Sequence, residues 1–173
     1  MTADGEIREL THREAEAAID SLAGVLHDCV AHGASVSFLW PFEMDNARQY
    51  WRQVISGLSR CRLFAAYRKG TLRGTVQLDL SVPPNQNHRG EIRKLLVHSS
   101  ARRQGLARRL MQRAEADARK AGLTLLTLDT VTGSPAESLY RSLGWQAAGI
   151  VPRYAKWPDG RFCDAAFMYK LVG

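Results

Sequence analysis

Residues 95–111 read LLVHSSARRQGLARRLM, and this stretch decides how the rest of the chain is interpreted. A short apolar run, typical of a strand inside a sheet, precedes small and basic residues and then apolar positions at helical spacing. Backbone N–H groups at the start of a helix lack an intrahelical acceptor and carry partial positive charge, so they bind phosphate oxygens well. Gly105 and Ala107 would let an anion approach that backbone closely. The stretch therefore predicts an anion-binding loop between a strand and a helix.

Positive charge is concentrated at this loop. Residues 102–113 contain five arginines and no acidic residue in a chain of net charge +7, whereas residues 1–30 carry seven acidic residues and two arginines. A nucleic-acid-binding protein usually spreads its basic residues over a face or a tail, so one concentrated site favours a compact polyanion. The loop is not a P-loop, because no Gly-Lys-Ser/Thr follows, and it lacks the three glycines of a Rossmann fingerprint. A basic loop that merely opens a solvated helix stays an alternative.

Length and composition indicate one globular domain over residues 1–173. The chain is 45% hydrophobic and 24% charged, as in ordinary globular domains. No apolar run is long enough to cross a membrane, and the first ten residues, MTADGEIREL, do not form a secretory signal. Three scattered cysteines argue against a disulfide scaffold and favour a reducing, cytoplasmic location.

Hydrophobic periodicity predicts alternating strands and helices in the second half of the chain. Thr11 and Glu14 form a capping box for a helix that is expected to continue to Gly33, and a second helix is expected after Pro41. A strand–helix–strand–helix–strand order requires a partly parallel α/β sheet. The expected strands are 7–10, 62–68, 72–80, 91–97, 123–129, 145–151 and 164–171, and the later helices are 105–121 and 135–143, the latter opened by a capping box from Ser134 to Glu137.

Two motifs together resemble the GNAT superfamily of N-acetyltransferases. Arg102, Gly105 and Ala107 match its Gln/Arg-x-x-Gly-x-Gly/Ala signature, and residues 136–145, AESLYRSLGW, resemble its Ala-x-x-Leu-Tyr-x-x-Leu-Gly-Phe segment. The resemblance covers roughly residues 91–151. Ala107 stands where glycine is commoner, yet it keeps the backbone accessible.

Two further departures affect no chemical group that the reaction needs. Gly133 stands where many members carry asparagine, and Trp145 replaces phenylalanine. Within the superfamily, the stretches 32–38 (HGASVSF), 91–97 and 158–161 (PDGR) are similar to those of tabtoxin-resistance acetyltransferases.

The resemblance implies a single-domain α/β GNAT fold: a mixed, mostly antiparallel sheet with a central parallel pair of splayed strands, flanked by helices. It also implies acetyl-CoA as cosubstrate, with pantetheine beside the strand that precedes the loop and the pyrophosphate at the loop. The cofactor-binding residues it implies are Leu95, Leu96, Val97, Arg102, Arg103, Gln104, Gly105, Leu106, Ala107, Arg108, Ser134 and Tyr140.

Acetyl transfer to an amine requires a group that accepts a proton, because an amine of pKa about 10 is protonated at neutral pH. Glu91 and Asp129 lie at or near the ends of neighbouring strands and are candidate bases. A solvated strand end for Glu91 and a turn acceptor for Asp129 are the alternatives.

By the resemblance, Tyr140 faces the departing sulfur; the alternative is a tyrosine of the helix core. A phenol titrates near 10 and a simple thiol near 8.5, so full proton donation is unfavourable by about 2 kcal/mol. Tyr140 is therefore expected to stabilise the thiolate by a hydrogen bond.

Weaker expectations concern the acceptor and metals. His32, Ser35, Trp40 and Tyr154 are candidate acceptor-binding residues. No metal is expected, because His27, Cys29 and His32 do not share one helical face. His98 is expected to be a solvated loop residue.

The expected function is transfer of acetyl from acetyl-CoA to a primary amine of a small molecule, such as a toxin or an antibiotic, by direct attack in a ternary complex. A polyamine, an aminoglycoside or a protein N-terminus stays open as acceptor. A nucleic-acid-binding regulator and a CoA sensor without catalysis are the alternatives of another class. The expected partners are acetyl-CoA and the amine, with no nucleic acid and no membrane, and the chain is expected to be a monomer or a homodimer.

Overall fold

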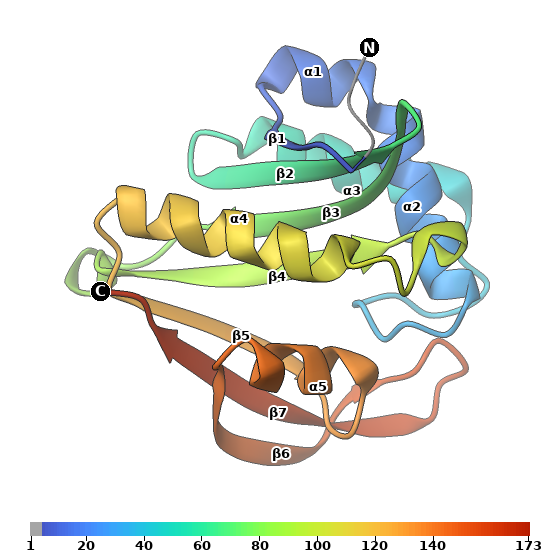
Figure 1. Cartoon of the computed structure of the whole chain (residues 1–173). Helices are drawn as coiled ribbons and strands as arrows, with labels where there is room; N and C mark the ends of the chain where they lie inside the picture. The colour runs from blue at the N-terminus through green and yellow to red at the C-terminus, as the bar shows by residue number, and fades with distance from the viewer. Residues whose placement is uncertain (1–4) are drawn as a thin grey trace.

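The strands form one seven-stranded sheet in the order β1-β2-β3-β4-β5-β7-β6 (Figure 1). The structure, a computed structural model, describes residues 5–173, so the first four residues of the acidic N-terminal segment lie outside it. The strands are β1 (Ile7–Glu9), β2 (Cys61–Arg68), β3 (Thr71–Asp79), β4 (Arg89–Val97), β5 (Leu125–Val131), β6 (Gln146–Lys156) and β7 (Phe162–Leu171). The helices are α1 (His12–Ala17), α2 (Ile19–Ala31), α3 (Met44–Ser56), α4 (Leu106–Lys120) and α5 (Pro135–Ser142), with short 3₁₀ turns η1 (Pro84–Gln86) and η2 (Ser99–Ala101).

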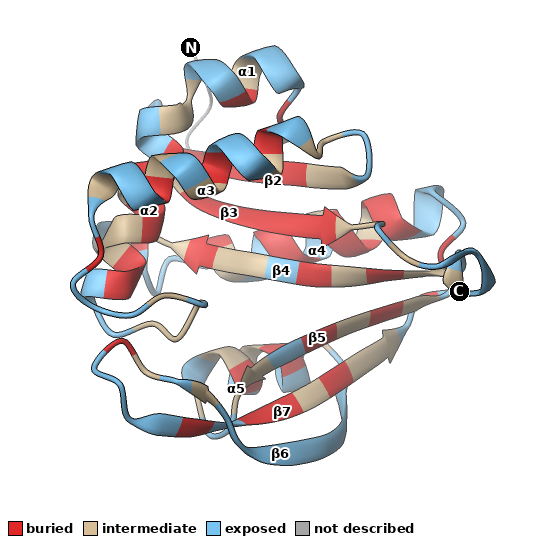
Figure 2. Ribbon diagram, turned by 180° about the vertical axis from the view of Figure 1, so that it is seen from behind, coloured by how far each residue is buried: buried red, intermediate tan, exposed pale blue. Residues whose placement is uncertain are grey.

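Helices cover both faces of the sheet. Figures 1 and 2 show α4 and α5 on one face and α1, α2 and α3 on the other. Each layer encloses its own apolar cluster: Leu110 and Met111 of α4 are fully buried in one, and Leu22, Leu26 and Trp51 of α2 and α3 are fully buried in the other. The expected single-domain α/β fold, a mixed sheet flanked by helices, is confirmed.

One pair of strands, β4 and β5, is parallel, and it separates after three residues. The paired residues run from Arg89↔Leu125 to Glu91↔Thr127, whereas every other neighbouring pair of strands is antiparallel. Beyond Glu91 and Thr127 the two strands diverge, as Figure 1 shows. The splayed pair expected from the family resemblance is therefore present, and we call the space after Glu91 and Thr127 the split.

β4 also carries a bulge beside the split. Thr75 of β3 pairs with Leu96 and Gln77 pairs with Arg93, so Lys94 and Leu95 together oppose one residue of β3. Lys94 adopts a left-handed backbone conformation with φ +48°. A bulge bends its strand and redirects its side chains, so the strand turns at the place where its partner leaves it.

Two local expectations were wrong. The helix expected from Thr11 to Gly33 is broken at Ala18, where ψ is 8°, although the predicted capping box of Thr11 and Glu14 is present. Alanine favours helix, so the residue type gives no signal for this break. At the start of α5, Ser134 accepts a hydrogen bond from the Glu137 N–H, but the Glu137 carboxylate accepts from the N–H of Gly133 at 2.7 Å, one residue before its expected partner.

Candidate active site

The loop between β4 and α4 presents a row of free backbone donors. Within the described part of the chain, the N–H groups of residues 103–108 have no hydrogen-bond acceptor; the first engaged amide is that of Arg109, which donates to Gly105 at 3.1 Å. Gly105, the N-cap of α4, has φ +77°, and Arg103 has φ +59°. Successive N–H groups in such a turn form a concavity that binds anions.

Basic side chains surround these donors. The residues exposed at the loop are Arg102, Arg103, Gln104, Gly105 and Arg108. Arg108 reaches α5, where it donates to the Ser142 hydroxyl at 2.8 Å, while Leu106 is buried and can offer only its N–H. The residues expected to bind the pyrophosphate are thus brought together, and their role stays a prediction.

The carbonyl of Val97 has partners of its own in this structure. It accepts from Arg102 Nε at 3.2 Å and from Cys29 Sγ at 3.5 Å. Leu95 and Leu96 of β4 lie beyond the last residue paired with β5, so their strand edge faces the split. The expectation that residues 95–97 bind pantetheine therefore rests more on Leu95 and Leu96 than on Val97.

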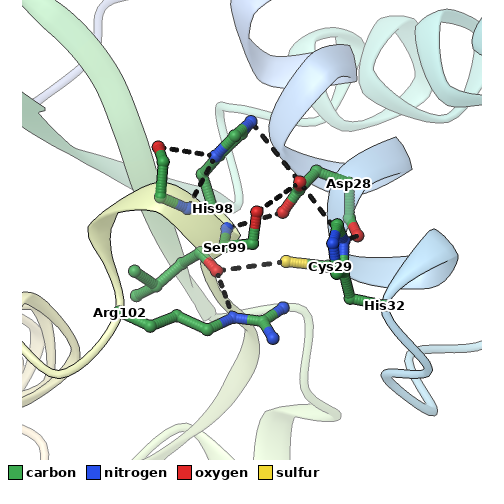
Figure 3. A network of polar contacts seen from close by, with 8 residues as sticks. Asp28, Cys29, His32, His98, Ser99 and Arg102 are labelled. Atoms are coloured by element: carbon green, nitrogen blue, oxygen red, sulfur yellow. Dashed lines mark hydrogen bonds and ion pairs between the residues drawn. The ribbon is translucent and has the colours of Figure 1, made fainter.

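A polar network ties the loop to the end of α2 (Figure 3). The carboxylate of Asp28 accepts from the N–H of Ser99 at 2.6 Å and from its hydroxyl at 2.8 Å. His98 and His32 place ring nitrogens 3.5 Å and 3.3 Å from the same carboxylate. Burial alone would raise the pKa of Asp28, but the Ser99 hydrogen bonds outweigh it and hold that pKa below its ordinary value. Asp28 therefore anchors η2, the turn that leads into the free amides.

His98 is not the solvated loop residue that was expected. Its side chain is 24% exposed, and its Nδ1 accepts from the N–H of Ser100 at 3.2 Å, which caps η2. Burial lowers the pKa of His98 despite the nearby Asp28. A histidine directly after a strand can cap the next turn, a role that residue type and spacing alone do not reveal.

The two candidate bases lie on opposite strands of the split and differ in their surroundings. Glu91 accepts from Arg93 at 3.0 Å, and Arg93 also binds Asp79 at 2.9 Å, so Glu91 is held in an ion-pair network. Asp129 has no ion-pair partner and accepts no hydrogen bond from another residue in the described part of the chain; its own backbone N–H is the donor near its carboxylate. Burial, and next the charge of Glu91, raises the pKa of Asp129. A carboxylate without a fixed partner and with a raised pKa is the better proton acceptor.

Tyr140 lies in α5, buried to 6% exposure beside Trp145, with ring centroids 6.1 Å apart. Burial, followed by the charge of Asp129, raises the pKa of its phenol. Tyr140 is therefore a weaker acid than a free phenol. It can donate a hydrogen bond but is poorly suited to transfer its proton. Ser134, the N-cap of α5, lies one helical turn and a half before it and has its hydroxyl 3.5 Å from that of Thr130.

The candidate acceptor residues do not form one group. Ser35 donates to the carbonyl of Lys156 at 2.7 Å and so links its loop to β6. His32 contacts Asp28 at the end of α2, so both side chains have structural contacts. Trp40, half exposed, lines a cleft of about 310 Å³ with Trp157 and Pro158. Tyr154, 52% exposed, packs edge-on against Phe167, the residue of β7 that pairs with Asp129. Trp40 and Tyr154 therefore remain candidates for acceptor binding.

Sequence reasoning missed Lys94 as a functional residue. Its ammonium donates to the hydroxyl of Ser37 at 3.0 Å and lies 5.5 Å from the ring centroid of Tyr50, on the α2–α3 side of the sheet. Burial lowers the pKa of Lys94, and the neighbouring Arg93 lowers it further. With strict alternation Lys94 would share the face of Ile92, which is buried beneath α4. The bulge, which the residue pattern does not reveal, turns Lys94 to the α2–α3 face instead.

Other kinds of site find no support in the described residues. Over residues 5–173, no group of three or more His, Cys, Asp or Glu side chains is placed to hold a metal ion. Likewise, none of the helices in this part of the chain has the length and apolar character needed to cross a membrane.

Comparison with known proteins agrees with this geometry. Residues 28–145 match the acetyltransferase (GNAT) family. The chain is 32% identical over 104 residues to an IAA acetyltransferase of Azospirillum brasilense; the aligned segment covers 60% of this chain and 66% of that relative, just under two thirds of its length.

Solved structures share the fold at low sequence identity. An N-acetyltransferase from Staphylococcus aureus superposes with a TM-score of 0.81 at 19% identity, covering 99% of this chain and 100% of that one. The yncA protein of Salmonella typhimurium, solved with its cofactor acetyl-CoA, superposes with a TM-score of 0.79 at 20% identity, covering 99% and 95%. With a matching family over most of its length, and with the splayed strands and the open loop that its motifs predict, this chain belongs to the acetyltransferase (GNAT) family.

Proposed function

We propose that the protein transfers the acetyl group of acetyl-CoA to a primary amine of a small molecule, by direct attack in a ternary complex. One observation carries the proposal: six consecutive free backbone N–H groups, surrounded by exposed arginines, open at the end of β4 where the sheet splits beside Asp129. The loop fits a pyrophosphate, because it offers fixed donors and positive charge at one point. The strand edge at Leu95 and Leu96 fits the amide groups of pantetheine.

On the acceptor side, the residues of the split supply the proton chemistry. Acetyl-CoA supplies an activated acyl carbon when bound. Asp129 takes a proton from the ammonium form of the acceptor, directly or through water. The amine nitrogen then forms its bond to the acyl carbon as the C–S bond breaks. The second proton that the nitrogen loses goes to the CoA thiolate, and the proton taken by Asp129 is released to solvent.

Tyr140 acts at the sulfur side of the same step. Its phenol donates a hydrogen bond to the departing sulfur, which lowers the energy of the thiolate without full proton transfer. The raised pKa of Tyr140 supports this assignment, since a weaker acid keeps its proton while it donates.

The nature of the acceptor is the least defined part of the proposal. A toxin or an antibiotic amine, as the similarity to tabtoxin-resistance acetyltransferases suggests, is our preferred class; a polyamine, an aminoglycoside or a protein N-terminus is the alternative. The cleft beside Trp40 has a volume of about 310 Å³, which suits a small molecule. We place the protein in the cytoplasm because Cys29, Cys61 and Cys163 are free thiols, and we treat it as a monomer or a homodimer.

Two measurements test the function. Isothermal titration with acetyl-CoA and with duplex DNA separates an enzyme from a nucleic-acid-binding regulator: we expect micromolar acetyl-CoA binding and no salt-sensitive DNA binding. A screen of amine libraries by thiol release separates an enzyme from a CoA sensor. Binding of acetyl-CoA with no thiol release for any amine would contradict the proposal.

A further inference from the structure

The ammonium group of Lys94 lies on the α2–α3 face of the sheet beside the split, and no described carboxylate pairs with it. Among the described residues, no carboxylate lies within ion-pair distance of its Nζ, whose one hydrogen bond goes to the neutral hydroxyl of Ser37 at 3.0 Å. An ammonium has three N–H donors, so two remain for another ligand. Lys94 is half-buried, so water solvates its ammonium only in part, and an anion that reached it would gain a charge-assisted hydrogen bond.

Neighbouring charges do not supply the missing anion. Arg93, on the same strand, already takes the carboxylates of Asp79 and Glu91, at 2.9 Å and 3.0 Å. Asp129 lies on the opposite strand, two residues beyond the last paired residue of β5, as Lys94 lies three residues beyond that of β4. The split therefore has a cationic side at Lys94 and an anionic side at Asp129, and the two influence each other electrostatically without forming an ion pair.

The backbone is strained where Lys94 and Ser37 meet. Five described residues other than glycine have positive φ, and two of them, Ser37 at +82° and Lys94 at +48°, are hydrogen-bonded to each other. Such conformations are unfavourable for residues other than glycine and are concentrated at functional sites. The loop that contains Ser37 is also tied to the β6–β7 connection by the bond from the N–H of Trp40 to Pro158 at 2.9 Å. The loop that binds the ammonium is thus itself fixed to the β6–β7 connection.

We propose that Lys94 binds an anionic group of the acceptor, so that the acceptor is a small amine that also carries a carboxylate, as in an α-amino acid. This inference rests on the proposed function, since it names the acceptor of that reaction. The carboxylate of the acceptor completes the charge of Lys94, while its amine lies toward Asp129, the group that takes its proton. One molecule with both charges satisfies both sides of the split.

Two other roles for Lys94 make different predictions. If Lys94 only tethers the Ser37 loop, replacing it will slow transfer to every amine alike. If Lys94 acts as a base itself, arginine in its place will abolish transfer to every amine. Binding of an acceptor carboxylate predicts instead that the loss depends on whether the amine carries a carboxylate.

The experiment compares matched acceptors on four proteins. The acceptors are the common L-amino acids, their carboxamides and the amines that lack the carboxyl group; the proteins are wild type, Lys94→Met, Lys94→Arg and Ser37→Ala. Thiol release gives kcat/KM for each pair. Titration of the N-acetylated acids and their carboxamides with each protein in the presence of CoA gives a readout that does not depend on turnover.

We expect wild type to prefer acids over the matching carboxamides, and we expect Lys94→Met to lower kcat/KM for acids by about ten- to hundredfold more than for carboxamides. Lys94→Arg and Ser37→Ala keep a cation and should keep the preference. Equal rates for acids and carboxamides in wild type, or equal losses in Lys94→Met, would overturn this inference and leave the proposed function standing. If no amine gives thiol release, the proposed function is wrong, and this inference falls with it.

Discussion

Asp28 lies outside the split, yet the structure predicts that it controls acetyl-CoA binding. Its carboxylate holds both donors of Ser99, at 2.6 Å and 2.8 Å, and Ser99 starts the turn that leads into the free amides (Figure 3). In Asp28→Asn, one oxygen can still accept a hydrogen bond, but the new amide N–H₂ group faces the second donor. One charge-assisted hydrogen bond is therefore lost.

The size of the effect follows from burial. The Asp28 side chain is 12% exposed, so water replaces little of the lost bond. A hydrogen bond to a charged group contributes about 1.5–3 kcal/mol, and about 1.4 kcal/mol corresponds to a tenfold change in a dissociation constant. Without this bond the loop is less ordered before acetyl-CoA binds, so part of the binding free energy is spent on ordering it. We expect the dissociation constant for acetyl-CoA to rise about tenfold, with kcat at saturating acetyl-CoA within about twofold of wild type.

A matched control distinguishes this effect from loss of charge on α2. Asp20 is 76% exposed and binds Arg48, so Asp20→Asn removes a surface ion pair that contributes about 0–1 kcal/mol. Isothermal titration should show normal acetyl-CoA binding for Asp20→Asn. An Asp28→Asn variant that binds acetyl-CoA as tightly as wild type, even with a lower melting temperature, would refute the reasoning.

The pH dependence of the same contact has a defined sign. Because the pKa of Asp28 is below its ordinary value of 3.8, the contact contributes fully above that value and is lost as the pH falls through the lower, folded-state pKa. Between pH 8 and pH 5 Asp28 stays ionised in the wild type and keeps its contribution to acetyl-CoA affinity. Any loss of affinity in that range must come from another group.

Three further predictions follow from the geometry. Tyr140→Phe should lower kcat by about tenfold or more while the dissociation constant of acetyl-CoA stays within about threefold, by thiol release and titration; equal losses would mark Tyr140 as a packing residue. Because the pKa of Asp129 is raised, kcat/KM should fall with decreasing pH at a value above that of an ordinary carboxyl, and Asp129→Asn should remove this limb; an unchanged pH profile would exclude Asp129 as the base. Urea denaturation should show a lower free energy of unfolding for Gly74→Ala, by about 1–3 kcal/mol, because the new Cβ would lie 2.9 Å from the Leu96 carbonyl oxygen. Gly24→Ala, in helix α2, meets nothing within 4 Å and should raise the free energy of unfolding by about 0.5–1 kcal/mol.

Much of the fold could be predicted because local signals determine it. The capping box of Thr11 and Glu14 and the N-cap at Ser134 mark helix starts through backbone chemistry that the residues impose. The alternation of apolar strands and amphipathic helices then required a parallel pair. It could not predict how far the pair extends, because the pairing stops after three residues beside a bulge that forms only where β3 and β4 meet.

The site shows the same division between local and tertiary information. The free amides follow from a strand, a left-handed glycine and a helix start, so the open loop was predictable from residues 95–111 alone, and its binding of an anion stays a prediction. Lys94 was not, because its position depends on a one-residue bulge that arises between two strands, and a one-residue shift moves a side chain to the opposite face. Asp28 was not predictable either, since residues 71 positions apart in the chain meet through the sheet. The loop proposed to bind acetyl-CoA thus lies within one contiguous stretch of sequence. The residues proposed to bind the acceptor, Lys94 and Asp129, come together only through tertiary structure, so the preference for an amine depends on the charges on the two strands of the split.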